Sequence, residues 1–186
     1  ESDYAYLAPA VALARAYNYL SPSTQADLRN SAKDSALLAA QYALTIYNTM
    51  LEDVRNGRSN PSYGIMRFYA YHVELFNWAY QVTNDSQWRN ALVQLADGIL
   101  ALQVTDQADA KFGGIKQNEG QFPGFLLDDQ GMKLWALRKA FDVTGDTRYR
   151  TAAQRVIENW LKLSNVDGLF EGLTRDYNAN QDVMIG

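Results

Sequence analysis

The chain has 186 residues, of which 47% are hydrophobic and 20% charged, with a formal net charge of −4 at neutral pH. The acidic balance, without a lysine and arginine cluster, argues against a nucleic-acid partner, and no apolar run reaches the roughly 20 residues that cross a bilayer. With no cysteine and a single histidine, the sequence excludes disulfides, thiolate catalysis and metal sites built from several Cys or His ligands.

Apolar residues recur at helical spacing in six segments. The segments run approximately over residues 4–14, 37–51, 65–79, 92–99, 134–141 and 156–161. In the last one, the expected apolar face includes Val156 and Ile157. No segment shows sustained alternation of apolar and polar residues, so the sequence predicts an all-α fold.

Two stretches that lie 61 residues apart read alike and define an internal repeat, residues 79–89 and 140–150. In each, an apolar helix ends, the chain turns through Thr-Asn-Asp or Thr-Gly-Asp, and a new helix begins. Asp85 and Asp146 are the predicted N-caps. With a fainter copy upstream, the repeat predicts three antiparallel helical hairpins, about six helices, stacked in one domain over residues 1–186. The expected units are approximately residues 3–59, 61–126 and 127–186.

Two long links follow the second and third hairpins, residues 104–127 and 165–186. Each contains a glycine-flanked apolar turn, Gly113-Gly114-Ile115 in the first and Gly168 to Gly172 in the second. We expect such turns to lie across the ends of the hairpins. In helical repeats the long insertions gather on one face, which is where a ligand surface forms.

The stretch from Leu127 to Tyr149 has Asp129 and Met132 at the start of a helix and a Thr-Gly-Asp turn at its end. It resembles the α/α-toroid superfamily of six-hairpin glycosidases and related polysaccharide lyases and epimerases, and locally the unsaturated glucuronyl and rhamnogalacturonyl hydrolases. The resemblance implies that the three hairpins form about half of a toroid. It also implies a glycoside hydrolase or related lyase that acts on a poly- or oligosaccharide.

On this resemblance Asp129 matches the acid/base aspartate of the family, and Asp128 is its neighbour. Glycoside hydrolysis uses two carboxyl groups that flank the scissile bond, so a partner has to come from the loops, where Glu119, Glu171 and Asp176 are candidates. Asp128 and Glu119 are predicted to assist Asp129. The alternative is structural, because acidic residues in the first turn of a helix cap it and interact favourably with its dipole.

Aromatic and charged residues beside this helix, and others near the third predicted helix, are candidates for binding a sugar. The predicted substrate-binding residues are Phe125, Trp135, Tyr63, Arg67 and His72. Flat rings stack on sugar faces, although aromatics at helical spacing also serve as core residues. His72 lies on an apolar stripe, which favours a core histidine; in a lyase it would be a base, with Arg67 neutralising a uronate carboxylate.

No cofactor or metal is predicted. Oxygen-bearing residues alternate from Asp176 to Asp182 as in calcium loops, but glutamine occupies the glycine position. The expected partner is a carbohydrate, with further hairpins of a larger chain or a second copy as other partners. The expected location is extracellular or periplasmic in a bacterium, with the cytoplasm as the alternative. The alternative function is a non-catalytic helical module that binds a protein or a glycan.

Overall fold

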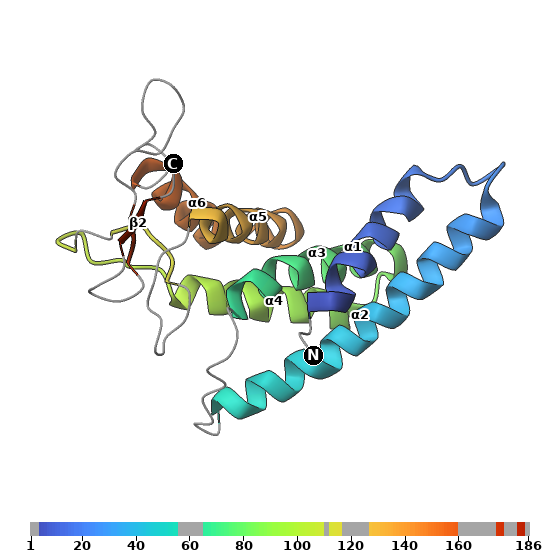
Figure 1. Ribbon diagram of the computed structural model, residues 1–186, viewed down its shortest axis with the longest axis horizontal. Helices are drawn as coiled ribbons and strands as arrows, with labels where there is room; N and C mark the ends of the chain where they lie inside the picture. Colours follow the sequence, from blue (N-terminus) through green and yellow to red (C-terminus); the bar gives the residue numbers. More distant parts are fainter. Residues whose placement is uncertain are drawn as a thin grey trace. The chain divides into compact units, whose positions relative to one another are not determined.

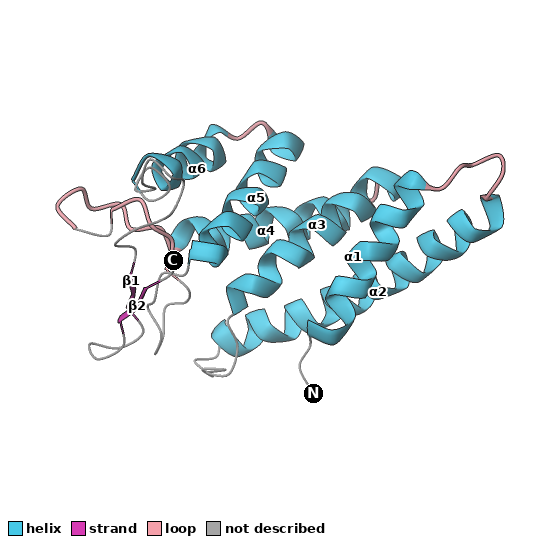
Figure 2. Ribbon diagram, turned by 45° about the horizontal axis from the view of Figure 1, so that its top comes forward, coloured by secondary structure: helices cyan, strands magenta, loops and turns pink. Residues whose placement is uncertain are grey.

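The computed structural model describes residues 4–55, 65–109, 112–116, 127–159, 174–176 and 182–184, and contains six helices (Figures 1 and 2). They are α1 (Tyr4–Tyr19), α2 (Ala26–Arg55), α3 (Ile65–Thr83), α4 (Ser86–Ala101), α5 (Leu127–Thr144) and α6 (Thr147–Asn159). The predicted all-α class and the number of helices are confirmed. The stacking of hairpins into a partial toroid stays a prediction.

Two short strands are the exception to the helical pattern in the described chain. Strand β1 (Thr174–Asp176) pairs antiparallel with β2 (Asp182–Met184), and Asp176 stands opposite Asp182. Three residues are too few to produce a sustained alternation of apolar and polar side chains, so periodicity could not predict these strands.

The chain forms two compact units. The first contains residues 1–60 and 71–92, and the second contains residues 61–70 and 93–186. Helices α3 and α4 therefore contribute to both units. The prediction of one domain made of three hairpin units stays a prediction.

In the first unit, α1 packs alongside α2 (Figure 1). The buried face of α2 consists of alanines, namely Ala32, Ala36, Ala40 and Ala43. Small side chains let two helices approach closely. The larger Leu38 and Tyr42 are 74% and 56% exposed on another face of the same helix.

Aromatic contacts join other helices of this unit. The ring of Phe76 on α3 stacks on Trp88 of α4, with the centroids 5.8 Å apart. Trp78 meets Tyr17 of α1 edge to face at 5.7 Å. Such ring pairs add to the stabilisation that their buried area provides. They join α1, α3 and the start of α4.

In the second unit, α5 and α6 form a hairpin, and its buried residues come from α4, α5, α6 and the loop after α4. The fully buried side chains include Ile99, Ile115, Leu137 and Val156. The expectation that Ile157 lies on the apolar face of the last helix is wrong, because this side chain is 50% exposed. The neighbouring Val156 faces the core instead, and consecutive residues on a helix point about 100° apart.

The two repeat turns are alike bond by bond. Asn84 and Gly145 both have positive φ, 55° and 70°, and each backbone N–H donates to the carbonyl four residues earlier at 2.7 Å. This is the left-handed cap that ends many helices. In each turn the preceding threonine accepts a hydrogen bond from the N–H of the aspartate that follows, Asp85 or Asp146.

The aspartates then cap the next helix. Asp85 Oδ1 accepts from the N–H of Gln87, and Asp146 Oδ1 accepts from the N–H of Arg148, both at 2.9 Å. These bonds satisfy amide groups that lack partners within the helix. The prediction that Asp85 and Asp146 are N-caps is confirmed.

Candidate functional site

The loop after α4 folds back on itself as a short antiparallel bridge. Gln103 pairs with Ile115, the N–H of Val104 donates to the carbonyl of Gly114 at 2.9 Å, and the N–H of Gly113 donates to the carbonyl of Val104 at 2.9 Å. Ile115 is completely buried. The apolar turn that two glycines mark in the sequence is thus part of the core of the second unit.

Gly113 brings this loop against the C-terminal half of α6. Its φ is +86°, and a Cβ atom at this position would lie 2.7 Å from the carbonyl oxygen of Arg155. The side chain of Gln103 donates from Nε2 to the carbonyls of Gly113, at 3.0 Å, and of Ala152, at 2.9 Å. One buried amide therefore joins the end of α4, the loop and α6.

Two side chains of α5 also form hydrogen bonds with this loop. The Gln130 amide bonds to both ends of the Ile115 residue, with Oε1 accepting from its N–H at 3.0 Å and Nε2 donating to its carbonyl at 2.8 Å. The ammonium of Lys133 donates to the carbonyls of Ile115 and Lys116 at 3.0 and 3.1 Å. Both side chains are 0% exposed.

These contacts define the open end of the α5–α6 hairpin, which is the end away from the turn at Gly145. It comprises the start of α5, the last turns of α6 and residues 112–116. The glycine turn after α4 contacts both helices of this hairpin, and its placement across the hairpin end stays a prediction. The buried polar side chains here are satisfied by hydrogen bonds to the backbone of the loop and of α6.

The sequence reasoning missed Gln103, Gln130 and Lys133, although a signal for two of them was present. Gln130 and Lys133 continue the apolar stripe of Leu137 backwards along α5, at spacings of seven and four residues. Polar residues on a stripe that faces a core have to be hydrogen-bonded there. Their position on the stripe therefore indicates a buried polar contact.

The predicted catalytic residues belong to the open end by their place in the chain. Asp128 and Asp129 are in the first turn of α5, directly before Gln130, and their side chains lie outside the described part of the structure. Glu119 lies outside the described residues altogether. The backbone carrying both aspartates is held close to the contact with Ile115, because Gln130 follows Asp129 directly.

Among the predicted substrate-binding residues, Trp135 is on α5 and 37% exposed. It follows Asp128 by seven residues, and this spacing places both residues on one side of the helix. Phe125 and Tyr63 lie outside the described residues. Arg67 is in α3, and its side chain is likewise not described.

His72 is in a different setting. It lies on α3 in the first unit, is 3% exposed, and its ring is 5.7 Å from that of Phe76. These surroundings favour the core interpretation of this histidine. A depression of about 440 Å³ also lies in the first unit, lined by residues 23–28 at the start of α2. None of the predicted site residues lines it.

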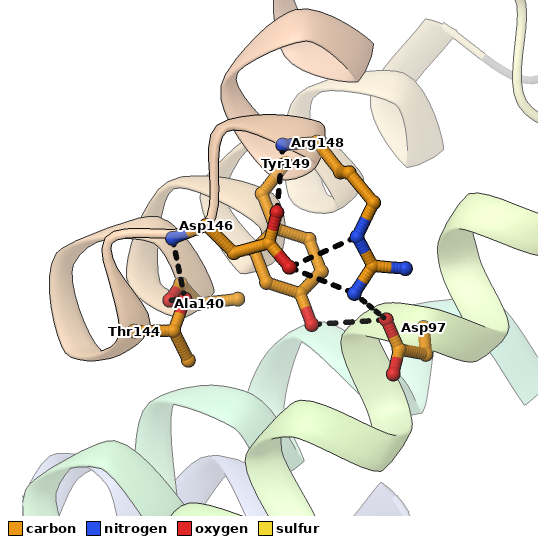
Figure 3. A network of polar contacts seen from close by, with 6 residues as sticks. All are labelled: Asp97, Ala140, Thr144, Asp146, Arg148 and Tyr149. Atoms are coloured by element: carbon orange, nitrogen blue, oxygen red, sulfur yellow. Dashed lines mark hydrogen bonds and ion pairs between the residues drawn. The ribbon is translucent and has the colours of Figure 1, made fainter.

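A second polar cluster lies at the closed end of the hairpin (Figure 3). Asp146 Oδ2 accepts from Arg148 Nε and Nη2 at 2.9 and 2.7 Å, and Arg148 Nη2 also contacts Asp97 of α4 at 3.5 Å. The hydroxyl of Tyr149 donates to Asp97 Oδ1 at 3.0 Å. The cluster thus ties α4 to the start of α6.

The ionisation of this cluster follows from its contacts. Hydrogen bonds from Arg148 lower the pKa of Asp146 below its ordinary value. Burial, together with the hydrogen bond to Asp97, raises the pKa of Tyr149 to about 12. At neutral pH the carboxylate is therefore charged and the phenol protonated, which is the state in which each bond forms. The carboxyl groups are engaged with neighbours, so the cluster has a structural role.

Among the side chains that the structure describes, no three His, Cys, Asp or Glu residues are grouped to hold a metal ion. The segment from Asp176 to Asp182, which partly matches a calcium loop in sequence, includes residues 177–181, which lie outside the described residues. None of the described helices is long and apolar enough to span a membrane.

No protein-family model matches the chain, and neither a curated protein nor a solved structure is significantly similar to it.

Proposed function

We propose that this chain is a carbohydrate-active domain, a glycoside hydrolase or related polysaccharide lyase, with its ligand surface at the open end of the α5–α6 hairpin. The observation that carries the proposal is that the acidic first turn of α5 directly precedes a buried contact with the loop after α4. This turn adjoins Gln130, which bonds to both polar groups of Ile115. The resemblance of residues 127–149 to the six-hairpin glycosidases supports the same location.

In this proposal Asp129 is the general acid/base, and Asp128 and Glu119 assist it. A hydrolase would protonate the glycosidic oxygen and direct water to the anomeric carbon, which requires two carboxyl groups on opposite sides of the bond. A helix N-terminus favours ionised carboxylates, which suits the partner that acts as base. Trp135, which is partly exposed on α5, is the aromatic side chain proposed to stack on a sugar.

The test is a screen of the full chain against polygalacturonate, alginate, xylan and laminarin. Release of reducing ends detects hydrolysis, and ultraviolet absorbance of unsaturated uronates detects elimination. We expect Asp129→Asn to abolish the activity found, because the amide cannot exchange a proton at this position. The matched control is Asp142→Asn, the same substitution on an exposed residue at the other end of α5.

Equal activity of the Asp129→Asn variant and the wild type would remove Asp129 from the mechanism. A second candidate function is a non-catalytic module that binds a glycan or a protein. One observation favours it: the described buried polar groups of the open end, Gln103, Gln130 and Lys133, bond to backbone carbonyls and so serve as framework. Binding of a polysaccharide without its turnover would support this alternative.

A further inference from the structure

The stripe along which α5 faces the core changes character from polar to apolar. Gln130 and Lys133 occupy its first part, and Leu137 and Ala140 occupy its second part; all four residues are 0% exposed. Removing an ammonium group from water costs several kcal/mol, and apolar residues could fill such a stripe without this cost. Burial alone therefore does not explain why Gln130 and Lys133 occupy the first part of the stripe.

The bonds of the polar half converge on one short piece of chain. Gln130 bonds to the N–H and the carbonyl of Ile115, and Lys133 donates to the carbonyls of Ile115 and Lys116. An apolar contact tolerates sliding by a fraction of a side chain, whereas a pair of opposed hydrogen bonds fixes one register. These bonds favour one register between the start of α5 and the loop.

We propose that Gln130 and Lys133 are positioning residues, which keep the first turn of α5 in a fixed register with residues 112–116 so that a sugar meets a preformed surface. This inference rests on the proposed function and adds to it the parts that orient Asp128 and Asp129. Neither positioning residue touches the sugar. Preorganisation of this kind keeps a catalytic group in its reactive geometry, so its loss is expected to affect turnover.

The experiment compares two variants that lose hydrogen bonds at opposite ends of the same hairpin. Gln130→Leu removes both bonds to Ile115 at the open end, and Tyr149→Phe removes the bond to Asp97 at the closed end. Both approximately keep the size of the side chain. Hydrogen exchange of the Ile115 amide and steady-state kinetics on the polysaccharide identified in the screen, polygalacturonate in the first instance, are measured for each.

We expect the Ile115 amide to exchange about tenfold faster in Gln130→Leu and at the wild-type rate in Tyr149→Phe. For turnover we expect kcat to fall by about tenfold to a hundredfold in Gln130→Leu with little change in KM, because the catalytic turn is misplaced while the binding surface remains. Tyr149→Phe should keep the wild-type kcat. Gln130→Leu removes two buried bonds and Tyr149→Phe removes one, so urea unfolding of both variants is measured to separate a loss of stability from the loss of kcat.

Lys133→Met serves as a second variant if Gln130→Leu does not fold, since it removes the ammonium and keeps an unbranched side chain of similar length. The same loss of kcat with little change in KM is expected. Equal exchange rates and equal kcat values in the open-end and closed-end variants would overturn the proposal. If the wild type acts on none of the polysaccharides, that result removes the proposed function, and the exchange rate of Ile115 decides the positioning role on its own.

Discussion

Replacing Gly113 by alanine tests the close approach of the loop after α4 to the backbone of α6. The added Cβ would lie 2.7 Å from the carbonyl oxygen of Arg155, closer than such atoms come without a shift. The φ of +86° adds a conformational cost of about 1 kcal/mol for a residue with a side chain. Movement of the loop is opposed by its bonds to Val104 and Gln103.

The contact itself should cost about 1–3 kcal/mol, as forced overpacking does in protein cores. Together with the conformational cost, Gly113→Ala should reduce the free energy of unfolding by about 2–4 kcal/mol. The matched control is Gly145→Ala. This glycine also has a positive φ, 70°, but nothing lies within 4 Å of the added Cβ. Only the conformational cost of about 1 kcal/mol should remain in the control.

Urea unfolding followed by circular dichroism measures both variants, and the difference between them isolates the contact with α6. Thermal unfolding should show the same order, at about 2–4 °C for each kcal/mol in a chain of this size. If Gly113→Ala is no less stable than Gly145→Ala, the loop does not approach α6 closely, and the contact between Gly113 and the Arg155 carbonyl is contradicted.

Two further predictions concern the cluster at the closed end of the hairpin. The pKa of Tyr149 is raised to about 12, so the stability that its phenol contributes is complete below the ordinary pKa of 10.0 and is lost as pH rises toward 12. Tyr149→Phe should therefore reduce the loss of unfolding free energy at alkaline pH, measured from about pH 9 to 12. A variant that unfolds with the wild-type alkaline dependence would show that the phenol is not in a perturbed site. The pKa of Asp146 is lowered from 3.8, so its contribution is present above that value and is lost as pH falls through the lowered pKa. Arg148→Gln, which copies the residue found at Gln87 in the other turn, should remove this part of the acid dependence, and an unchanged acid unfolding midpoint would contradict the role given to Arg148.

Features determined by a few neighbouring residues could be read from the sequence. The caps at Asp85 and Asp146 are local, because each carboxylate bonds to an amide only two residues away. The helices could be predicted for the same reason, since their apolar spacing is visible within a single segment. Local rules were therefore sufficient for the all-α class.

Features that depend on packing between helices could not be predicted from local patterns. On α2 the buried face is the alanine face, because close approach to α1 favours small side chains, and the larger Leu38 and Tyr42 face away. Hydrophobicity alone would not place Leu38 outside the buried face of this helix. Ile157 was misplaced by a similar argument, since Val156 alone of the two reaches the core.

For the candidate site, the sequence pointed to the start of α5 but not to what holds it. The glycine turn at Gly113 was visible, whereas its partners Gln103 and Arg155 come from two other elements. Long-range hydrogen bonds of this kind leave no periodic pattern in a sequence. A buried polar residue on an apolar stripe, such as Lys133, is the nearest equivalent to a signal.

The two repeat turns also have a consequence for how a protein of this type can lengthen by gene duplication. Every bond that shapes each of them joins residues no more than four positions apart, from Ala79 to Gln87 in one and from Ala140 to Arg148 in the other. A segment that encodes its own bend can be duplicated and inserted elsewhere without compensating changes in the rest of the gene. Tandem duplication can therefore lengthen a protein of this type by whole hairpins, and each new copy is free to diverge at its open end.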